Sequence, residues 1–281
     1  MGPSFAIHQY TDEIYKVVYF KRSTDDEHIY LRDPETFEHK GVKLDASFSR
    51  ARSMVLQYAL CNPWDYFFTG TLDEKKMNRY DLETYAAQFS QWIRDRRKQY
   101  GVKFNVLLVP ELHKDGAWHM HGFVHGLPGD VLERFKPPAP LDLVRSDFLN
   151  WPDYERRFGF CSLGPIKDPV KCAFYVTKYI GKGFAGRDGD VGKHLYFHSR
   201  PLKRAVKASD VYGYDAGLES LCVNDYQFCK TGMVLDQDFT FPLSFDGADY
   251  EISPFLDRDT LLKDFDPASI EPTYEQLSIF R

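Results

Sequence analysis

The strongest constraint on the fold comes from two strand-forming runs that flank Lys114-Asp115-Gly116. A three-residue loop with glycine at its left-handed position is a favoured hairpin connection. With that loop, Glu111 lies opposite His119, and His121 follows two residues later on the same face of the sheet. The hairpin therefore predicts that two imidazoles and one carboxylate converge on one face.

This set of donors suits Mn²⁺, Mg²⁺ or Zn²⁺ and leaves coordination positions open for a substrate. We expect Mn²⁺ or Mg²⁺, with the ion polarising a phosphate oxygen as a Lewis acid. His113 shares the face and is a possible substitute ligand. The alternative is a chance His-x-His pattern in which a histidine lies on the surface. Thr69 and Thr71 alternate along a predicted strand, so both face one way and are candidates to bind DNA or to orient the ligands.

A second group of side chains lies in a predicted helix over residues 168–180. Tyr175 and Tyr179 are four residues apart and therefore share a face, with Lys178 beside them. A free phenol has a pKa of about 10 and is a poor nucleophile at neutral pH. An adjacent ammonium and a metal-polarised phosphate lower the barrier to its attack. The alternative is ordinary core packing, but the interleaved lysines argue against full burial.

Charge is distributed unevenly along the 281 residues. Residues 161–207 carry 10 basic and 3 acidic side chains, whereas residues 208–281 carry 15 acidic and 4 basic ones. The basic stretch predicts a polyanion-binding surface, with Lys171 and Lys182 as candidate DNA contacts. We expect the acidic region to contact a partner or to screen the basic face.

The chain contains no apolar run of membrane-spanning length and no signal pattern, so no membrane association is expected. Its five cysteines are scattered and fit a reducing intracellular compartment.

The predicted elements mix strands and helices. Strands are expected at 14–20, 66–72, 104–112, 117–125, 159–163 and 195–197, and helices at 45–60, 81–98 and 168–180. Irregular structure is expected beyond residue 208. The predicted domains are an N-terminal extension of a strand plus a helix (1–62), a central domain (63–207) and an acidic C-terminal region (208–281).

Three motifs in this order resemble those of the HUH (His-hydrophobic-His) endonucleases, in particular the rolling-circle replication initiators of small single-stranded DNA phages. Phe67-Phe68-Thr69-Gly70-Thr71-Leu72-Asp73 is similar to the first motif, although Gly70 replaces a larger residue. His119-Met120-His121-Gly122, preceded by Glu111, is similar to the metal motif, and Tyr175-Val-Thr-Lys178 to the tyrosine motif. The resemblance covers roughly residues 60–205 and implies an α+β fold. That fold is a central antiparallel sheet with helices packed on one face, as in RNA-recognition-motif and ferredoxin-like domains.

The resemblance implies that Glu111, His119 and His121 hold the metal and that Tyr175 is the leading nucleophile. Lys178 would steady the phosphate, and Tyr179 matches the second nucleophile of two-tyrosine members. The implied reaction nicks single-stranded origin DNA, forms a 5′-phosphotyrosine and frees a 3′-hydroxyl primer. A second transesterification later rejoins the strand.

The sequence contains no GxxxxGK[ST], so no ATP site is expected. Unwinding and synthesis would come from a host helicase and polymerase, in the cytoplasm of a bacterial host.

Three other readings remain open. A transposase of the HUH type also places its tyrosine after the histidines, whereas relaxases usually place it before them. A non-catalytic module would bind single-stranded nucleic acid through residues 161–207, with Tyr175 and Tyr179 stacking on bases. A histidine-triad hydrolase is disfavoured because Phe123 occupies the place of the third histidine.

Overall fold

The computed structural model describes residues 3–21, 40–180, 195–226, 228–235 and 258–272, with only the backbone described for 40–46. The chain divides into two compact units. One combines residues 1–41 with 203–263, and the other combines residues 42–202 with 264–281. The predicted domain limits after residues 62 and 207 stay predictions. No helix in the described parts is long and apolar enough to cross a membrane. Residue Lys182 and the rest of 181–194 lie outside the described residues.

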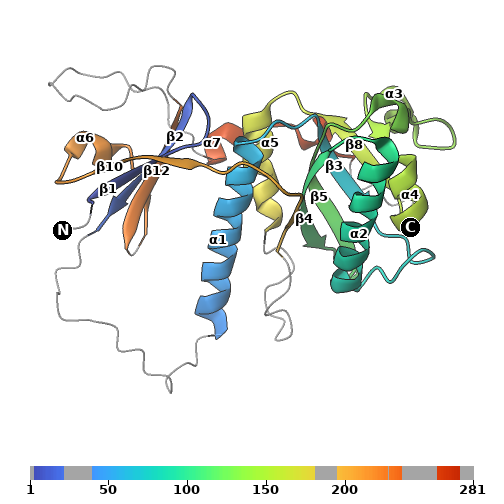
Figure 1. Cartoon of the computed structure of the whole chain (residues 1–281), viewed down its shortest axis with the longest axis horizontal. Coiled ribbons are helices and arrows are strands. Elements are labelled where there is room, and N and C mark those ends of the chain that lie inside the picture. Colours follow the sequence, from blue (N-terminus) through green and yellow to red (C-terminus); the bar gives the residue numbers. More distant parts are fainter. Residues whose placement is uncertain (1–2, 22–39, 181–194, 227, 236–257, 273–281) are drawn as a thin grey trace. The chain divides into compact units, whose positions relative to one another are not determined.

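The first unit is built on an antiparallel sheet of five strands among the residues described (Figure 1). Their order is β10 (Val206–Val211), β1 (Phe5–Gln9), β2 (Ile14–Phe20), β12 (Cys229–Leu235) and β11 (Asn224–Asp225). Short helices α6 (Ala216–Ser220) and α7 (Arg258–Leu262) belong to the same unit. The expectation of irregular structure beyond residue 208 was therefore wrong for β10, β11 and β12.

Alternation along the strands explains the core of this unit. Phe5 and Ile7 of β1 and Tyr15 and Val17 of β2 occupy alternate positions and pack into one cluster. The other buried members of the cluster are Leu218, Leu221, Cys222 and Val234. A Cβ at Gly232 would lie 1.6 Å from the Leu221 carbonyl oxygen, so only glycine allows this approach.

The second unit contains the larger antiparallel sheet, which has seven strands within the described ranges. Their order is β6 (Glu133–Arg134), β7 (Leu149–Asn150), β8 (Cys161–Pro165), β3 (Tyr66–Thr71), β5 (Trp118–His125), β4 (Asn105–Leu112) and β9 (Phe197–His198). Its helices are α1 (Lys40–Leu60), α2 (Leu82–Tyr100), α3 (Leu141–Arg145), α4 (Pro152–Phe158) and α5 (Pro169–Val176). Three 3₁₀ turns are η1 (Gly129–Val131), η2 (Thr177–Tyr179) and η3 (Pro267–Ser269). The expected α+β class with an antiparallel sheet is confirmed.

Helices cover both faces of this sheet. The neighbouring residues Phe67 and Phe68 of β3 point to opposite faces. Phe67 lies 5.8 Å from the Tyr175 ring of α5, and Phe68 lies 4.9 Å from the Tyr154 ring of α4. Figure 1 shows α1 and α5 on one side of β3, β4 and β5, and α2 and α4 on the other. The expectation that helices pack on one face only was wrong, because the two predicted helices α2 and α5 already lie on opposite faces.

Local sequence signals account for the helix starts. The Asp81 carboxylate accepts a hydrogen bond from the Thr84 amide at the start of α2, and Asp168 accepts one from Lys171 at the start of α5. The sequence analysis predicted helices that begin at these two positions. The α-helical part of the tyrosine helix ends at Val176, and η2 continues it to Tyr179.

Gly70, the residue that departs from the first motif, makes room for a neighbour. A Cβ at this position would lie 2.7 Å from the Tyr154 hydroxyl. Tyr154 is fully buried, and its hydroxyl lies 3.3 Å from that of Tyr85. The departure therefore reflects how α4 packs on the sheet.

Candidate active site

The hairpin of β4 and β5 sets the positions of the three predicted metal ligands. Gly116 has φ 84°, and the His113 amide donates to the Ala117 carbonyl at 2.9 Å. With this loop, Glu111 pairs with His119, as the sequence predicted. His121 follows on the same face, and all three side chains are buried.

The three side chains are of the kinds that bind a divalent ion, and the spacing between Glu111 and His121 also suits one. His121 Nε2 lies 2.9 Å from Glu111 Oε2, which is close to the separation of about 3 Å between adjacent ligands on an octahedral ion with bonds of about 2.1 Å. His119 stacks on His113, with ring centroids 4.5 Å apart. No group of three His, Cys, Asp or Glu side chains among the described residues has the geometry of a complete metal site. The direct contact between Glu111 and His121 closes part of the space that an ion would take.

Hydroxyl groups on β3 and β8 line the same face. Thr69 pairs with His121 on one side and with Ser162 on the other, and Thr71 pairs with His119. The hydroxyls of Thr69, Thr71 and Ser162 are buried and have no hydrogen-bond partner among the described residues. Buried polar groups are normally satisfied, so these hydroxyls indicate a place for a polar ligand beside the histidines. The sequence predicted the direction of both threonines but not Ser162.

The two tyrosines and Lys178 meet the histidines from the other side. The Tyr179 hydroxyl oxygen lies 3.2 Å from the Tyr175 hydroxyl oxygen. The Tyr179 ring lies flat on the His121 ring, with centroids 3.9 Å apart and an interplanar angle of 2°. Lys178 Nζ lies 3.4 Å from the centroid of the Tyr175 ring. The structure thus brings the predicted metal ligands and nucleophiles together.

Both tyrosines are covered in this structure. Tyr175 is 4% exposed and Tyr179 is 2% exposed, so the expectation that the lysines would keep this face open was wrong. Burial raises the pKa of both hydroxyls above the usual value of about 10, and the nearby charge of Glu271 raises it further.

Glu271 is a member of the site that the sequence analysis missed. Its carboxylate accepts hydrogen bonds from the Tyr175 hydroxyl and, at 2.6 and 2.8 Å, from the Tyr179 hydroxyl. It also lies 3.1 Å from His121 Nδ1 and 3.6 Å from Lys178 Nζ. Burial alone would raise the pKa of Glu271, but His121, Lys178 and the Tyr175 hydroxyl together lower it to about 2. No local pattern marks this residue, which stands 96 positions after Tyr175.

The predicted DNA contact Lys171 lies further out, as does His125 of the β4–β5 hairpin. Lys171 is on the first turn of α5, where its Nζ lies 3.9 Å from Asp168 Oδ2. His125, at the far end of β5, contacts Asp65 at 3.1 Å. Neither residue contacts the tyrosines in the contacts described here.

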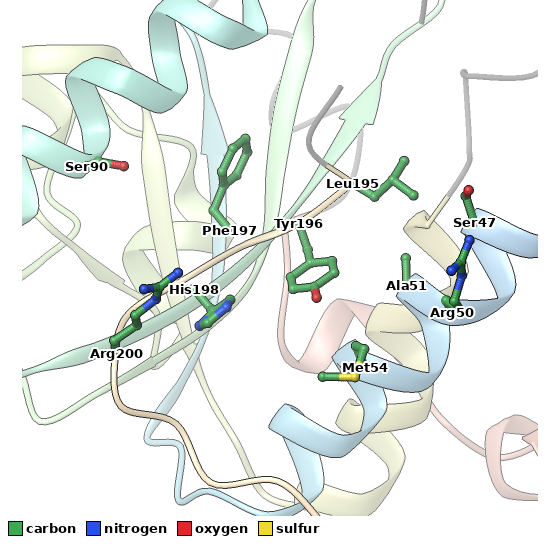
Figure 2. Close-up of a pocket in the computed structure, with 10 residues that line it drawn as sticks. All are labelled: Ser47, Arg50, Ala51, Met54, Ser90, Leu195, Tyr196, Phe197, His198 and Arg200. Carbon is green, nitrogen blue, oxygen red and sulfur yellow. The ribbon is translucent and has the colours of Figure 1, made fainter. Parts of the chain in front are cut away.

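A hollow of about 600 Å³ lies on the same unit, between α1 and the chain around β9 (Figure 2). Figure 2 shows Arg50 of α1 on one side, Arg200 on the other and Tyr196 between them. The His198 ring, which also lines the hollow, stacks on the Tyr58 ring, with centroids 4.5 Å apart. β9 runs antiparallel to β4 with His198 opposite Leu107, so the chain before it continues towards the Glu111 end of β4. Basic and aromatic side chains therefore line a hollow beside the strand that carries Glu111.

A comparison with known families links these motifs to DNA replication. Residues 65–184, which hold all three motifs, match the family model of the replication-associated protein ORF2/G2P. This match confirms that residues 65–184 resemble the replication-associated proteins to which rolling-circle initiators belong. No curated protein and no solved structure matches the chain significantly.

Proposed function

We propose that this protein nicks single-stranded origin DNA by tyrosine transesterification and thereby starts rolling-circle replication. The observation that carries the proposal is the meeting of two tyrosine hydroxyls, 3.2 Å apart, with the His121 ring and its Glu111 partner. The match of residues 65–184 to a replication-associated family supports the same function.

The proposed chemistry uses the phenol oxygen of Tyr175 as nucleophile. This oxygen attacks the phosphorus atom, a tyrosine–phosphate bond forms, and the bond from phosphorus to the 3′ oxygen breaks. The 3′ oxygen leaves with a proton as the 3′-hydroxyl primer, and the 5′ end stays on the protein. Lys178, whose Nζ lies over both tyrosine rings, would offset the charge that develops on the phosphate. Exchange of one phosphodiester for another requires no ATP.

Glu111, His119 and His121 would hold Mn²⁺ or Mg²⁺, which would supply Lewis-acid polarisation of a phosphate oxygen. Thr69 and Thr71 would bind the phosphate or steady the histidines opposite them. Tyr179 would act as the second nucleophile when the strand is rejoined. Its hydroxyl oxygen lies 3.2 Å from that of Tyr175 and would therefore be close to the same phosphate.

The hollow between α1 and β9 is the proposed place for DNA next to the nick. Arg50 and Arg200 would bind phosphates, and the Tyr196 ring would stack on a base. Lys171 and Lys182 would add to this basic surface. A host helicase and polymerase are the proposed partners, in the cytoplasm of a bacterial host.

The test is a covalent-capture gel with Mn²⁺ and a pool of single-stranded DNAs that includes the candidate origin. We expect an adduct that withstands denaturation, that EDTA abolishes and that the Tyr175→Phe variant lacks. Persistence in Tyr175→Phe but loss in Tyr175→Phe/Tyr179→Phe would make Tyr179 a nucleophile in its own right. If the protein binds DNA from an origin-containing pool but forms no adduct, the nicking function is refuted and the non-catalytic binding module is favoured. Adducts only with transposon-end sequences would favour a transposase.

A further inference from the structure

Residues 264–272 form a strap that lies on the site from within the same unit. The Phe265 ring packs on the Tyr175 ring, with centroids 5.1 Å apart. Ile270 is 2% exposed, and its backbone lies so close to Gly164 of β8 that a Cβ there would be 2.1 Å from the Ile270 carbonyl oxygen.

The strap holds Glu271 firmly in place. Asp266 caps η3 by accepting a hydrogen bond from the Ala268 amide at 3.0 Å. The Glu271 amide then donates to the Pro267 carbonyl at 3.0 Å. A hydrogen-bonded turn between the Phe265 ring, which packs on Tyr175, and the buried Ile270 therefore places the carboxylate in the site.

Four hydrogen-bond donors or cations converge on this one carboxylate. They are the hydroxyls of Tyr175 and Tyr179, His121 Nδ1 and Lys178 Nζ. A phosphodiester that is to react needs the same neighbours, because the attacked phosphorus must come to within about 3–3.5 Å of a phenol oxygen. The carboxylate thus occupies an anion position that the substrate requires.

Burial decides between two roles for Glu271. A carboxylate that only oriented the tyrosines would leave their oxygens open to the substrate. Here Tyr175 and Tyr179 are 4% and 2% exposed, and one carboxylate oxygen accepts from both hydroxyls. A phosphate group cannot enter while that carboxylate is in place.

We propose that residues 264–272 are an autoinhibitory strap, in which the Glu271 carboxylate occupies the position of the scissile phosphate and single-stranded DNA must displace it. The inference rests on the proposed nicking function. It adds a competitor within the chain, so that the tyrosines react only when the correct DNA outcompetes the strap. The strap lies in the strongly acidic C-terminal region, and this gives one of the acidic residues there a defined contact.

The experiment compares the wild type with Glu271→Gln in two assays. The first measures the affinity for a single-stranded origin oligonucleotide in EDTA, where no chemistry occurs. The second measures adduct formation with Mn²⁺ at subsaturating and saturating DNA. If the strap is docked in about 90% of molecules, the variant should bind about tenfold more tightly, because apparent affinity scales with the competent fraction. Adduct formation should accelerate similarly at subsaturating DNA and little at saturation.

Glu133→Gln is the matched control, because it removes the same charge from an exposed position on β6. Equal gains in DNA affinity for both variants would show that the effect comes from net charge, and this would overturn the proposal. Slower adduct formation in Glu271→Gln at both DNA concentrations would show that Glu271 assists the reaction, which also overturns it. If Glu271→Gln does not fold, Phe265→Ala, which loosens the strap and keeps the carboxylate, should show the same gain.

The two proposals fail separately. If the wild type binds DNA but neither it nor Glu271→Gln forms an adduct, the nicking function fails. The affinity comparison in EDTA still reports whether the strap competes with DNA.

Discussion

Gly164→Ala tests how the strap is docked without touching any residue of the site. Gly164 has no positive φ, so alanine suits its backbone conformation. The added Cβ would nevertheless lie 2.1 Å from the Ile270 carbonyl oxygen, where ordinary contact begins at 3.4 Å. Ile270 must therefore retreat by about 1.3 Å, the difference between those two distances.

That shift is large enough to break the contacts of the next residue. The shorter bonds of Glu271 to Tyr179 are 2.6 and 2.8 Å, and about 1 Å more takes them past the hydrogen-bond range of about 3.2 Å. Overpacking of this kind costs about 1–3 kcal/mol. For a domain of about 150–250 residues, each kcal/mol lowers Tm by roughly 2–4 °C. We expect a lower Tm together with faster adduct formation at subsaturating DNA.

The assay is differential scanning fluorimetry beside the covalent-capture gel, with Gly129→Ala as the control. A Cβ at Gly129 meets no atom within 4 Å, so that variant should match the wild type in both measurements. A Tm for Gly164→Ala equal to that of Gly129→Ala would show that the strap is not docked on β8. A lower Tm with slower adduct formation would place the strap on β8 but refute its inhibitory role.

Two further outcomes are expected. The pKa of Asp153 is lowered, because hydrogen bonds from Tyr100 and Arg96 outweigh burial, which alone would raise it. The ionised Asp153 carboxylate therefore stabilises the folded protein above the unfolded-state pKa of about 3.9. This stabilisation is lost as the pH falls through the lower pKa of the folded state. Urea unfolding should find Asp153→Asn less stable at pH 7, with a difference that shrinks below about pH 4, and a constant difference would contradict this. Arg200→Ala should weaken binding of all single-stranded DNAs and reduce the salt slope by about one, whereas an unchanged slope would remove Arg200 from the DNA path.

The metal-ligand face could be predicted because it depends on short-range rules. A glycine in the left-handed conformation fixes the loop, the loop fixes the register, and the period of two places Glu111, His119 and His121 on one face. The spacing of four residues likewise placed Tyr175 beside Tyr179, even though the α-helix ends at Val176. In each case the residues that decide the geometry lie within about ten positions of each other.

The β6–β7 edge of the larger sheet and most of the smaller sheet could not be predicted in the same way. β12 pairs with β2 across more than 200 residues, Gly232 interrupts its apolar pattern, and β10 has exposed residues at its start. Such strands form by pairing with strands far away in the sequence, and their own residues show little alternation between apolar and polar. For the same reason, residues beyond 208 were expected to be irregular although several of them are strands.

Glu271 shows why the composition of a region is a poor guide to what a single residue does. The excess of acidic residues after position 207 suggested a surface that contacts a partner or screens the basic face, and such a surface would keep its carboxylates in water. The partly buried Glu271 instead contacts two phenols, an imidazole and an ammonium, where one charge in a fixed position matters more than the net charge of the region. A nuclease that acts on a polyanion must hold cations and donors in its site, and such a site also attracts the carboxylates of its own chain. A nearby acidic segment is therefore a natural source of an internal competitor. Residues 208–281 contain 15 acidic side chains, and the close approach of Ile270 to Gly164 brings one of them, Glu271, into the site.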